Sequence, residues 1–380
     1  MPTYKNLLPG DPAPWFHARS STRTDFALDV IAGRYIVLCF FATADARGKS
    51  AVAAAFTERD LFDDMNASFF GVSIDPADEG QRRVVGRPQG FRFFWDFDGA
   101  ISKLYGAIPR DAEAVGDKVP LRRIWVVLDP TLRVLKVMPF VEDGSDAKEL
   151  LDYLKSLPPV SRFAGFEVQA PILILPNVFE SDFCRKLMAL HKTYGGAESG
   201  FMRDVNGRTV QLHDYGHKRR RDHTIQDEEV IQQAQQRFSR RVVPELLKTY
   251  QFKATHMERF LVGCYSVEDG GHFVAHRDNT TKGTAHRRFA ASVNLNSDFD
   301  GGEVSFPEYG PRGFKPPPGG AVVFSCSLLH AVSKVTRGRR YAFLPFIYDD
   351  EAAKMREANS AFLDEGEGDS GDIGRRDSIG

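Results

Sequence analysis

Hydrophobic and polar positions follow two different patterns along this chain, and the change falls near its middle. In the first part, continuous apolar runs at 34–42 and 122–129 alternate with stretches of helical character such as 51–65. Apolar runs of strand-forming residues between helices are typical of strands that are buried on both faces of a sheet. We therefore predict an α/β layer for the N-terminal part.

From Glu258 onward the pattern changes to short strand-like runs that are separated by turns rich in Gly and Pro. In residues 287–296, apolar side chains such as Val293 alternate with polar ones such as Ser292. This period of two indicates strands with one apolar and one polar face. Six or more such strands predict a double-stranded β-helix, or jelly roll, with supporting helices such as one over 227–250 that Pro244 kinks or divides.

Between the two patterns lies the stretch 156–171, SLPPVSRFAGFEVQAP, in which Pro, Gly and Ser accumulate. Consecutive prolines disfavour a helix, so we place the domain boundary here. The last residues are acidic and rich in Gly, a composition typical of disorder. The predicted segments are a first domain over 1–157, a linker over 158–171, a second domain over 172–350 and a disordered tail over 351–380.

Composition narrows the class of protein. The 380 residues are 42% hydrophobic and 27% charged, with a formal net charge of −1. This balance gives no overall field for nucleic acid, and no run of about 18 apolar residues predicts a membrane span. The four cysteines form no CxxC pair, which fits a reducing compartment. We predict a soluble cytoplasmic protein without nucleic-acid or membrane partners.

A metal site is predicted from two separate segments. His276 and Asp278 alternate along a strand-like run and should therefore share one face, and His330 closes another run 52 residues after Asp278. Two imidazoles and one carboxylate form the ligand set of non-haem Fe(II), which leaves coordination positions open. His272 lies on the same predicted face as His276 but too far along the strand to ligate the same ion. The other histidines are predicted to be loop or surface residues: His213, His217, His223, His256 and His286.

The basic run 217–221, HKRRR, lies in the stretch 196–224, whose glycines and mixed charge argue against a packed element. We interpret the run as a solvated basic loop. The alternative is that the run attracts an anionic substrate. In either case the stretch is the candidate substrate lid, because loops on a rigid scaffold carry specificity.

The first domain contains LLPGDPAPWF, GRYIVLCFFA, GVSIDPADEG, FWDFDGAISKLYGA and RRIWVVLDP in this order. Residues 5–155 thereby resemble the peroxiredoxin branch of the thioredoxin fold, which implies a thioredoxin-like domain. In that family a cysteine at a helix N-terminus reacts with peroxide as a thiolate. That position corresponds here to Lys49, which cannot perform the reaction.

Other family positions are also altered. The family's threonine corresponds to Ala46 and its acidic residue to Val52, while the later basic residue is placed at Arg123. Cys39 lies inside an apolar strand and is predicted to be an inert packing residue; a redox sensor that uses Cys39 is the alternative. We therefore predict a catalytically inactive domain that serves as a scaffold, a docking surface or a homodimer interface.

The second domain contains HxD at 276–278, a GGE turn at 301–303 and HAVSKVTRGRR from His330. Residues 172–349 thereby resemble the Fe(II)- and 2-oxoglutarate-dependent dioxygenases, in particular the prolyl 4-hydroxylase-like group. The resemblance implies Fe(II) on the three predicted ligands, 2-oxoglutarate as cosubstrate, O2, and ascorbate as an auxiliary reductant.

The resemblance also implies a binding site for the cosubstrate. In that group a basic residue ten positions after the second histidine binds the C5 carboxylate of 2-oxoglutarate, and this position is Arg340. A guanidinium suits the task because its planar fork matches a carboxylate. Arg337 and Arg339 are nearby alternatives, and the Tyr265 hydroxyl is a second candidate contact for the same cosubstrate.

The predicted function is a dioxygenase that hydroxylates an unactivated C–H bond, with a prolyl or other amino-acid residue in a peptide or protein as substrate. Two alternatives stay open. One is a hydroxylase of a free amino acid or small metabolite. The other is a sensor of iron, oxygen or 2-oxoglutarate, or an interaction protein.

Overall fold

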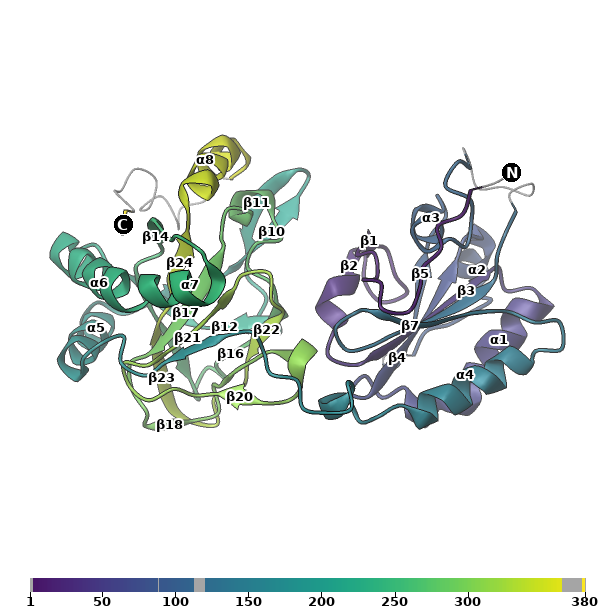
Figure 1. The fold of residues 1–380 in the computed structure, drawn as a ribbon, viewed down its shortest axis with the longest axis horizontal. Helices are drawn as coiled ribbons and strands as arrows, with labels where there is room; N and C mark the ends of the chain where they lie inside the picture. The colour runs from purple at the N-terminus through teal and green to yellow at the C-terminus, as the bar shows by residue number, and fades with distance from the viewer. Residues whose placement is uncertain (1–2, 88, 113–119, 364–377, 380) are drawn as a thin grey trace. The chain divides into compact units, whose positions relative to one another are not determined.

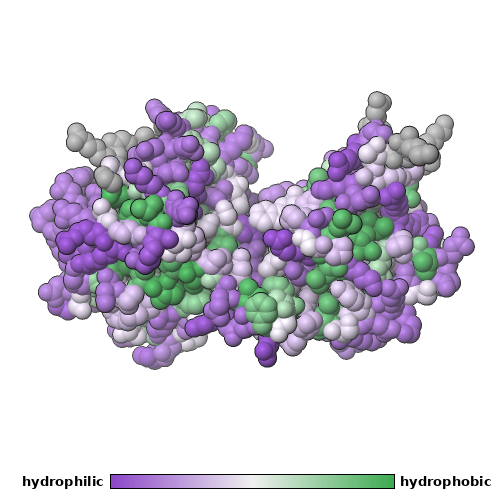
Figure 2. All heavy atoms as spheres, in the orientation of Figure 1, coloured by the Kyte–Doolittle hydropathy of each residue, from purple (hydrophilic) through white to green (hydrophobic). Residues whose placement is uncertain are grey.

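The computed structural model describes residues 3–87, 89–112, 120–363 and 378–379. The chain divides into two units, one formed by Met1–Gln169 with Pro307–Pro311 and the other by Ala170–Phe306 with Arg312–Gly380. Each unit has its own sheets and helices (Figure 1). The face shown in Figure 2 is mostly hydrophilic, with hydrophobic side chains in patches on each unit. None of the helices in the described ranges is long and apolar enough to cross a bilayer.

The first unit is built on a five-stranded mixed sheet with the order β5-β4-β3-β6-β7. β3 pairs in parallel with β4 and β4 with β5, whereas β6 is antiparallel to β3 and β7. Helices α1 and α4 lie along one face of this sheet (Figure 1) and pack Ala55 and Leu150 into the same core. The strands are β1 (His17–Ala18), β2 (Phe26–Ala27), β3 (Tyr35–Ala42), β4 (Ala67–Ser73), β5 (Phe91–Trp95), β6 (Ile124–Leu128) and β7 (Val134–Pro139), and the helices are α1 (Ala46–Thr57), α2 (Pro76–Gly80), α3 (Ala100–Tyr105) and α4 (Ser145–Ser156).

The central strand β3 is buried at every position, which explains its continuous apolar run. Covering helices leave neither face of such a strand in water, so polar residues find no place in it. The predicted thioredoxin-like α/β fold is confirmed.

Two large antiparallel sheets form the barrel of the second unit, beside the separate two-stranded sheet of β10 and β11. A ten-stranded sheet follows the path β14-β24-β17-β23-β15-β13-β9, with β8, β18 and β21 as further members, and a five-stranded sheet has the order β12-β16-β22-β19-β20. The predicted jelly roll is thereby confirmed. The strands are β8 (Leu173–Leu175), β9 (Ala197–Glu198), β10 (Phe201–Val205), β11 (Arg208–Leu212), β12 (Lys218–Arg219), β13 (Arg221–Thr224), β14 (His256–Glu258), β15 (Leu261–Ser266), β16 (His272–His276), β17 (Phe289–Asn294), β18 (Phe299–Asp300), β19 (Val304–Ser305), β20 (Gly313–Phe314), β21 (Ala321–Ser325), β22 (His330–Val332), β23 (Arg337–Phe343) and β24 (Phe346–Tyr348).

Helices support the larger sheet from outside the barrel. α5 (Ser181–Tyr194), α6 (Glu228–Arg241) and α7 (Val243–Tyr250) contribute Leu187, Phe238 and Leu246 to the core that contains Val293 and Phe343 of the sheet. The predicted division of 227–250 by Pro244 is confirmed, because this proline occupies the first turn of α7, where no hydrogen-bond donor is required.

The prediction that residues 196–224 lack a packed element is wrong. β10 and β11 pair from Phe201↔Leu212 to Val205↔Arg208, and Asn206 and Gly207 form the two-residue turn, both with positive φ. Such a turn matches the right-handed twist of a hairpin, and Asn-Gly is its strongest local signal.

The predicted disordered tail is wrong for its first residues. α8 (Asp350–Asn359) begins at Asp349, whose side chain accepts a hydrogen bond from the Ala352 amide. Near the end of the chain, Ile379 is buried and its amide donates to the Thr255 carbonyl. Residues 364–377 and 380 of the predicted tail lie outside the described residues.

Candidate metal centre

The three predicted metal ligands meet between neighbouring strands of the five-stranded sheet. His276 ends β16 and pairs across the ladder with His330, the first residue of β22. Asp278 follows β16, and its amide donates to the Cys326 carbonyl at 3.0 Å. The Asp278 carboxylate lies 3.4 Å from Nε2 of His276 and 3.3 Å from Nε2 of His330. One ligand atom from each residue falls within 4.8 Å of the others, which suits a single ion.

Backbone contacts orient both imidazoles toward this point. Nδ1 of His276 lies 2.9 Å from the Val274 carbonyl, and Nδ1 of His330 lies 3.0 Å from the Leu328 carbonyl. A carbonyl can only accept, so each Nδ1 carries the proton and each Nε2 presents a lone pair. This arrangement is the usual support for a histidine that binds a metal.

Electrostatics favour the protonation states that a metal requires. Burial, reinforced by the neighbouring His276, lowers the pKa of His330 to about 4. Burial by itself would raise the pKa of Asp278, but the His330 and His276 rings in their protonated forms, together with the Arg287 guanidinium, hold it well below its usual range. A neutral imidazole and an ionised carboxylate are therefore available at neutral pH, as metal binding demands.

The predicted placement of His272 on the face of His276 is wrong. The pairing register of β16 with β22 shifts between Phe273 and His276, which marks a bulge or irregularity. An extra residue in a strand reverses the alternation of faces beyond it. Accordingly the Phe273 ring stacks on His276 with centroids 3.5 Å apart, while His272 contacts the Gly270 and Gly216 carbonyls.

Arg340 is a deeply buried cation of this barrel. It lies on β23 in register with Tyr265 of β15, and it is 1% exposed. Its Nε–H donates to Asn294 Oδ1 at 3.0 Å, and a hydrogen on its second terminal nitrogen, Nη2, donates to Ser292 Oγ at 2.6 Å. The first terminal nitrogen, Nη1, is buried without any hydrogen-bond partner. A buried guanidinium nitrogen that lacks a partner fits an anionic ligand such as a carboxylate.

The two alternative arginines are placed differently. Arg337 is exposed and pairs with Asp300 at 2.6 Å, and Arg339 is exposed and pairs with Glu268 at 3.3 Å. Neither of these two guanidiniums lies in the barrel core, so Arg340 is the residue that the geometry selects. Its assignment to the cosubstrate stays a prediction.

Tyr265 lies beside Arg340 and is 1% exposed. Its hydroxyl accepts a hydrogen bond from Arg220 at 3.2 Å, and the Arg340 guanidinium carbon lies 5.4 Å from its ring centroid. The hydroxyl keeps a hydrogen that it can donate, so contact with the cosubstrate is chemically feasible and stays a prediction. The polar alternation of β17 places Ser292 and Asn294 inward, but the sequence alone did not indicate that they hold Arg340.

The two glycines of the GGE turn, which lies beside Arg340, are required by the local backbone. Gly301 and Gly302 both adopt positive φ. A Cβ at Gly301 would lie 2.1 Å from the Lys334 carbonyl oxygen, and one at Gly302 would lie 3.1 Å from the Arg340 side chain. Glycine is therefore required for the backbone to pass this close to Arg340.

The interpretation of HKRRR as a solvated loop is wrong for two of its residues. Lys218 and Arg220 are buried, 5% and 8% exposed. Arg220 forms two 2.6 Å hydrogen bonds with Asp222, and Lys218 donates to Ser199 Oγ at 2.7 Å and to the Gly200 carbonyl at 2.5 Å. Because β12 pairs with β16, Lys218 lies opposite Phe273, whose ring stacks on the predicted metal ligand His276.

The placement of His286 on the surface is also wrong. His286 is 2% exposed, and its Nε2 lies 2.9 Å from the buried Glu258 carboxylate. Arg287 and Arg356 contact the same carboxylate at 2.8 and 3.2 Å. These contacts form a structural network that links β14, the segment before β17 and α8.

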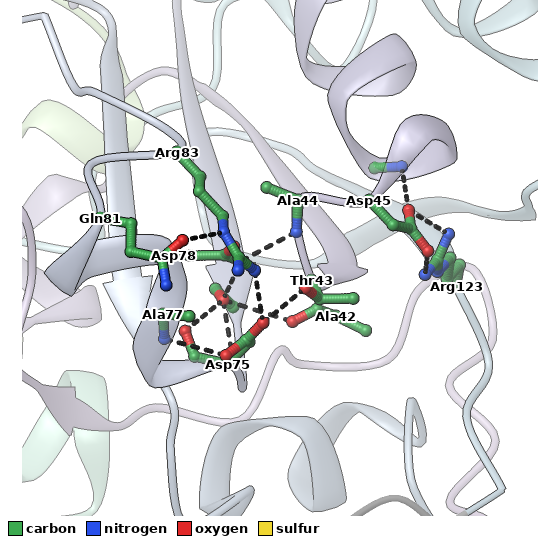
Figure 3. A network of polar contacts seen from close by, with 12 residues as sticks. Ala42, Thr43, Ala44, Asp45, Asp75, Ala77, Asp78, Gln81, Arg83 and Arg123 are labelled. Carbon is green, nitrogen blue, oxygen red and sulfur yellow. Dashed lines mark hydrogen bonds and ion pairs between the residues drawn. The ribbon is translucent and has the colours of Figure 1, made fainter.

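An ion pair lies at the N-terminus of α1, the helix that contains Lys49 (Figure 3). Arg123 lies at the N-terminus of α1, where both its terminal nitrogens contact Asp45, at 3.0 and 2.5 Å. Asp45 also caps the helix by accepting from the Gly48 amide. An internal carboxylate thus occupies the positive helix end. Cys39 is fully buried, and burial raises its pKa well above the usual value, which makes it unreactive.

Comparisons with known proteins agree with both resemblances. Residues 260–348 match the 2OG-Fe(II) oxygenase superfamily, and residues 9–135 match the AhpC/TSA family. Both resemblances are confirmed. A "PKHD-type hydroxylase" of Cupriavidus metallidurans is 40% identical over 85 residues, which cover 20% of this chain and 37% of the relative. The "PKHD-type hydroxylase PiuC" of Pseudomonas aeruginosa is 36% identical over 91 residues, which cover 22% and 39%. The match thus spans less than two fifths of either relative's length.

Solved structures resemble each part of the chain at low identity. A prolyl hydroxylase from Trichoplax adhaerens, in complex with a peptide fragment of the hypoxia inducible factor oxygen degradation domain, is 18% identical with a TM-score of 0.38. It matches 50% of this chain and 86% of that structure. Peroxidoxin BcpB from Mycobacterium tuberculosis is 24% identical with a TM-score of 0.32, and the match covers 40% and 99%.

Proposed function

We propose that this protein is an Fe(II)- and 2-oxoglutarate-dependent dioxygenase that hydroxylates an unactivated C–H bond. The observation that carries the proposal is the pairing of two features in one barrel. Two imidazoles and a carboxylate converge on one point, and Arg340 presents a buried guanidinium nitrogen without a partner. A metal site alone would fit many functions, but an unsatisfied guanidinium in the same barrel fits a cosubstrate that carries a carboxylate.

In the proposed function, different side chains bind the metal and the cosubstrate. His276, Asp278 and His330 would hold Fe(II), and their backbone contacts keep both Nε2 atoms directed at it. Arg340 would bind the C5 carboxylate, while Ser292 and Asn294 hold its guanidinium in place. When bound, the iron supplies activation of O2 coupled to decarboxylation of 2-oxoglutarate to succinate. The chain's part is to orient both reactants and to exclude water from the barrel.

For the substrate we propose a prolyl or other amino-acid residue in a peptide or protein. Support comes from the prolyl 4-hydroxylase-like motifs in residues 276–340 and from the hydroxylase relatives. A free amino acid or small metabolite is the alternative within the same chemistry.

The test is succinate release from 2-oxoglutarate by the Fe(II)-loaded protein in the presence and absence of O2. We expect release that requires both Fe(II) and O2 and that is lost in Asp278→Asn. The matched control is Asp300→Asn, whose carboxylate is exposed and pairs with Arg337 at 2.6 Å. Full turnover in Asp278→Asn, or no Fe(II)-dependent release from the folded wild type, would refute the proposal.

A further inference from the structure

Lys218 is a buried ammonium group near the predicted metal ligand His276. The proposed function gives this group no role. Two of its three hydrogens are donated to Ser199 Oγ and to the Gly200 carbonyl, and the group lies 4.8 Å from the centroid of the Phe273 ring. The Phe273 ring in turn stacks on His276. One hydrogen of the ammonium group therefore remains available.

No carboxylate of the described residues lies within ion-pair distance of Lys218. The nearby Asp222 is already shared by Arg220, at 2.6 Å, and Arg259, at 3.6 Å. Burial together with Arg220 lowers the pKa of Lys218 well below its usual value, and the more distant Asp222 and Asp278 carboxylates offset this lowering only in part. A bound anion would restore the favourable charged state.

The cosubstrate does not account for this position. In the proposed function one carboxylate of 2-oxoglutarate binds Arg340 and the other end chelates the metal, so both of its anionic ends have partners. Lys218 also lies on a different strand, β12 of the five-stranded sheet, whereas Arg340 lies on β23 of the larger sheet. The anion for Lys218 must then come with the substrate.

Lys218 is one of the residues that line a surface cleft of the second unit. Exposed residues including Glu198, Tyr215 and Arg221 line this cleft, and its buried lining residues are Lys218 and Arg220. The three carboxylates of the lining already have partners: Glu198 accepts from the Tyr215 hydroxyl at 2.8 Å, Asp214 accepts from the Gly216 amide at 2.8 Å, and Asp269 pairs with Arg221 at 3.5 Å. Within this cleft Lys218 is the buried cation that has no counter-ion.

We propose that Lys218 binds a carboxylate of the substrate, so that the enzyme takes an anionic substrate with its acidic group next to β12. This inference rests on the proposed function. The carboxylate belongs to a free amino acid, to a peptide C-terminus or to an acidic residue near the hydroxylated position. An ammonium in a dry site discriminates an acid from its amide because only the acid supplies the compensating charge.

The test uses probes that differ only in this charge: L-proline with L-prolinamide, and two blocked proline-containing peptides that carry either Asp or Asn beside the proline. Binding is measured by titration calorimetry on the Mn(II)- and 2-oxoglutarate-loaded protein under nitrogen, and stimulated succinate release is measured with Fe(II) in air. We expect the acid of at least one pair to bind about tenfold or more tightly than its amide. In Lys218→Gln the ratio should fall to about one, and Lys218→Arg should restore part of it.

Lys248→Met is the matched control, because Lys248 is exposed on α7 and pairs with Glu245. It should keep the wild-type ratio, and thermal melts verify that each variant is folded. Equal binding of acids and amides by the wild type would overturn the inference without any variant. So would an unchanged ratio in Lys218→Gln, or a loss of 2-oxoglutarate binding in that variant as large as in Arg340→Met, which would assign the carboxylate to the cosubstrate. A wild type that binds no 2-oxoglutarate refutes the proposed function instead.

Discussion

Arg340→Met is the sharpest perturbation of the proposed cosubstrate site. Nη1 of Arg340 carries two hydrogens and is buried without a partner, so a carboxylate can accept two charge-assisted bonds there. A hydrogen bond to a charged group contributes about 1.5–3 kcal/mol. Even one such bond plus part of a second amounts to about 3 kcal/mol, which is about 150-fold in Kd.

The assay is an anaerobic titration of 2-oxoglutarate into Mn(II)-loaded protein. Arg340→Met should weaken binding by about two orders of magnitude while Mn(II) still binds, since the metal ligands are untouched. Arg340→Lys should give an intermediate loss, because it keeps the charge but not the planar fork. The control is Arg337→Met, which removes an exposed guanidinium and should change Kd by less than about threefold.

Stability must be followed in parallel, because Arg340→Met also removes the donors that bind Ser292 and Asn294. Each unsatisfied buried acceptor costs about 1–3 kcal/mol, so the variant should melt at a lower temperature than the wild type. A folded Arg340→Met protein that binds 2-oxoglutarate within threefold of the wild type would refute the reasoning.

Three further predictions follow from particular side chains. His276→Ala should lower metal content after dialysis at least about a hundredfold, whereas His272→Ala should retain the metal, because the His272 ring contacts backbone carbonyls instead of the ligand cluster. Cys39→Ser should not alter peroxide consumption, which we expect to be at background in the wild type as well, since the thiol is fully buried; thiol-dependent turnover would contradict this. Hydrogen bonds from two arginines lower the pKa of Glu180 to about 2, so its stabilisation is present above the unfolded value near 4.5 and is lost as pH falls through about 2. With 47% of the side chain exposed, Glu180→Gln should cost only about 1 kcal/mol in urea unfolding at pH 7 and less at pH 3; an equal cost at both values would show the pairing to be irrelevant.

Much of the fold could be predicted because buried strand positions are occupied by apolar residues and exposed ones by polar residues. The run over β3 is apolar throughout because both faces are covered, and β17 alternates because one face meets the core and the other meets Arg340. Pro244 divided a helical stretch as expected. The hairpin at Asn206 and Gly207 is also local in origin, but the glycines and mixed charge around it obscure its Asn-Gly turn signal.

Other features had no local signal. The shift of register in β16 that turns Phe273 toward His276, and His272 away from it, depends on pairing with β22. The burial of His286 depends on Glu258, which is 28 residues away in the chain. In both cases the partner is supplied by a distant segment, so no pattern within a short window could indicate it.

The sequence by itself determined the ligand types of the metal centre and their spacing, whereas burial in the folded protein separated Arg340 from the exposed alternatives Arg337 and Arg339. Ligand chemistry depends on residue type, and a strand's period of two places His276 and Asp278 together. Only the tertiary structure decided that HKRRR is partly interior. By residue type alone, a run of basic residues is expected to be exposed to water. Here the pairing of β12 with β16 and the hydrogen bonds to Ser199 and Gly200 hold Lys218 in a buried position close to Phe273. Burial of that charge depends on contacts among segments far apart in the chain, which is why it could be seen only in the folded protein.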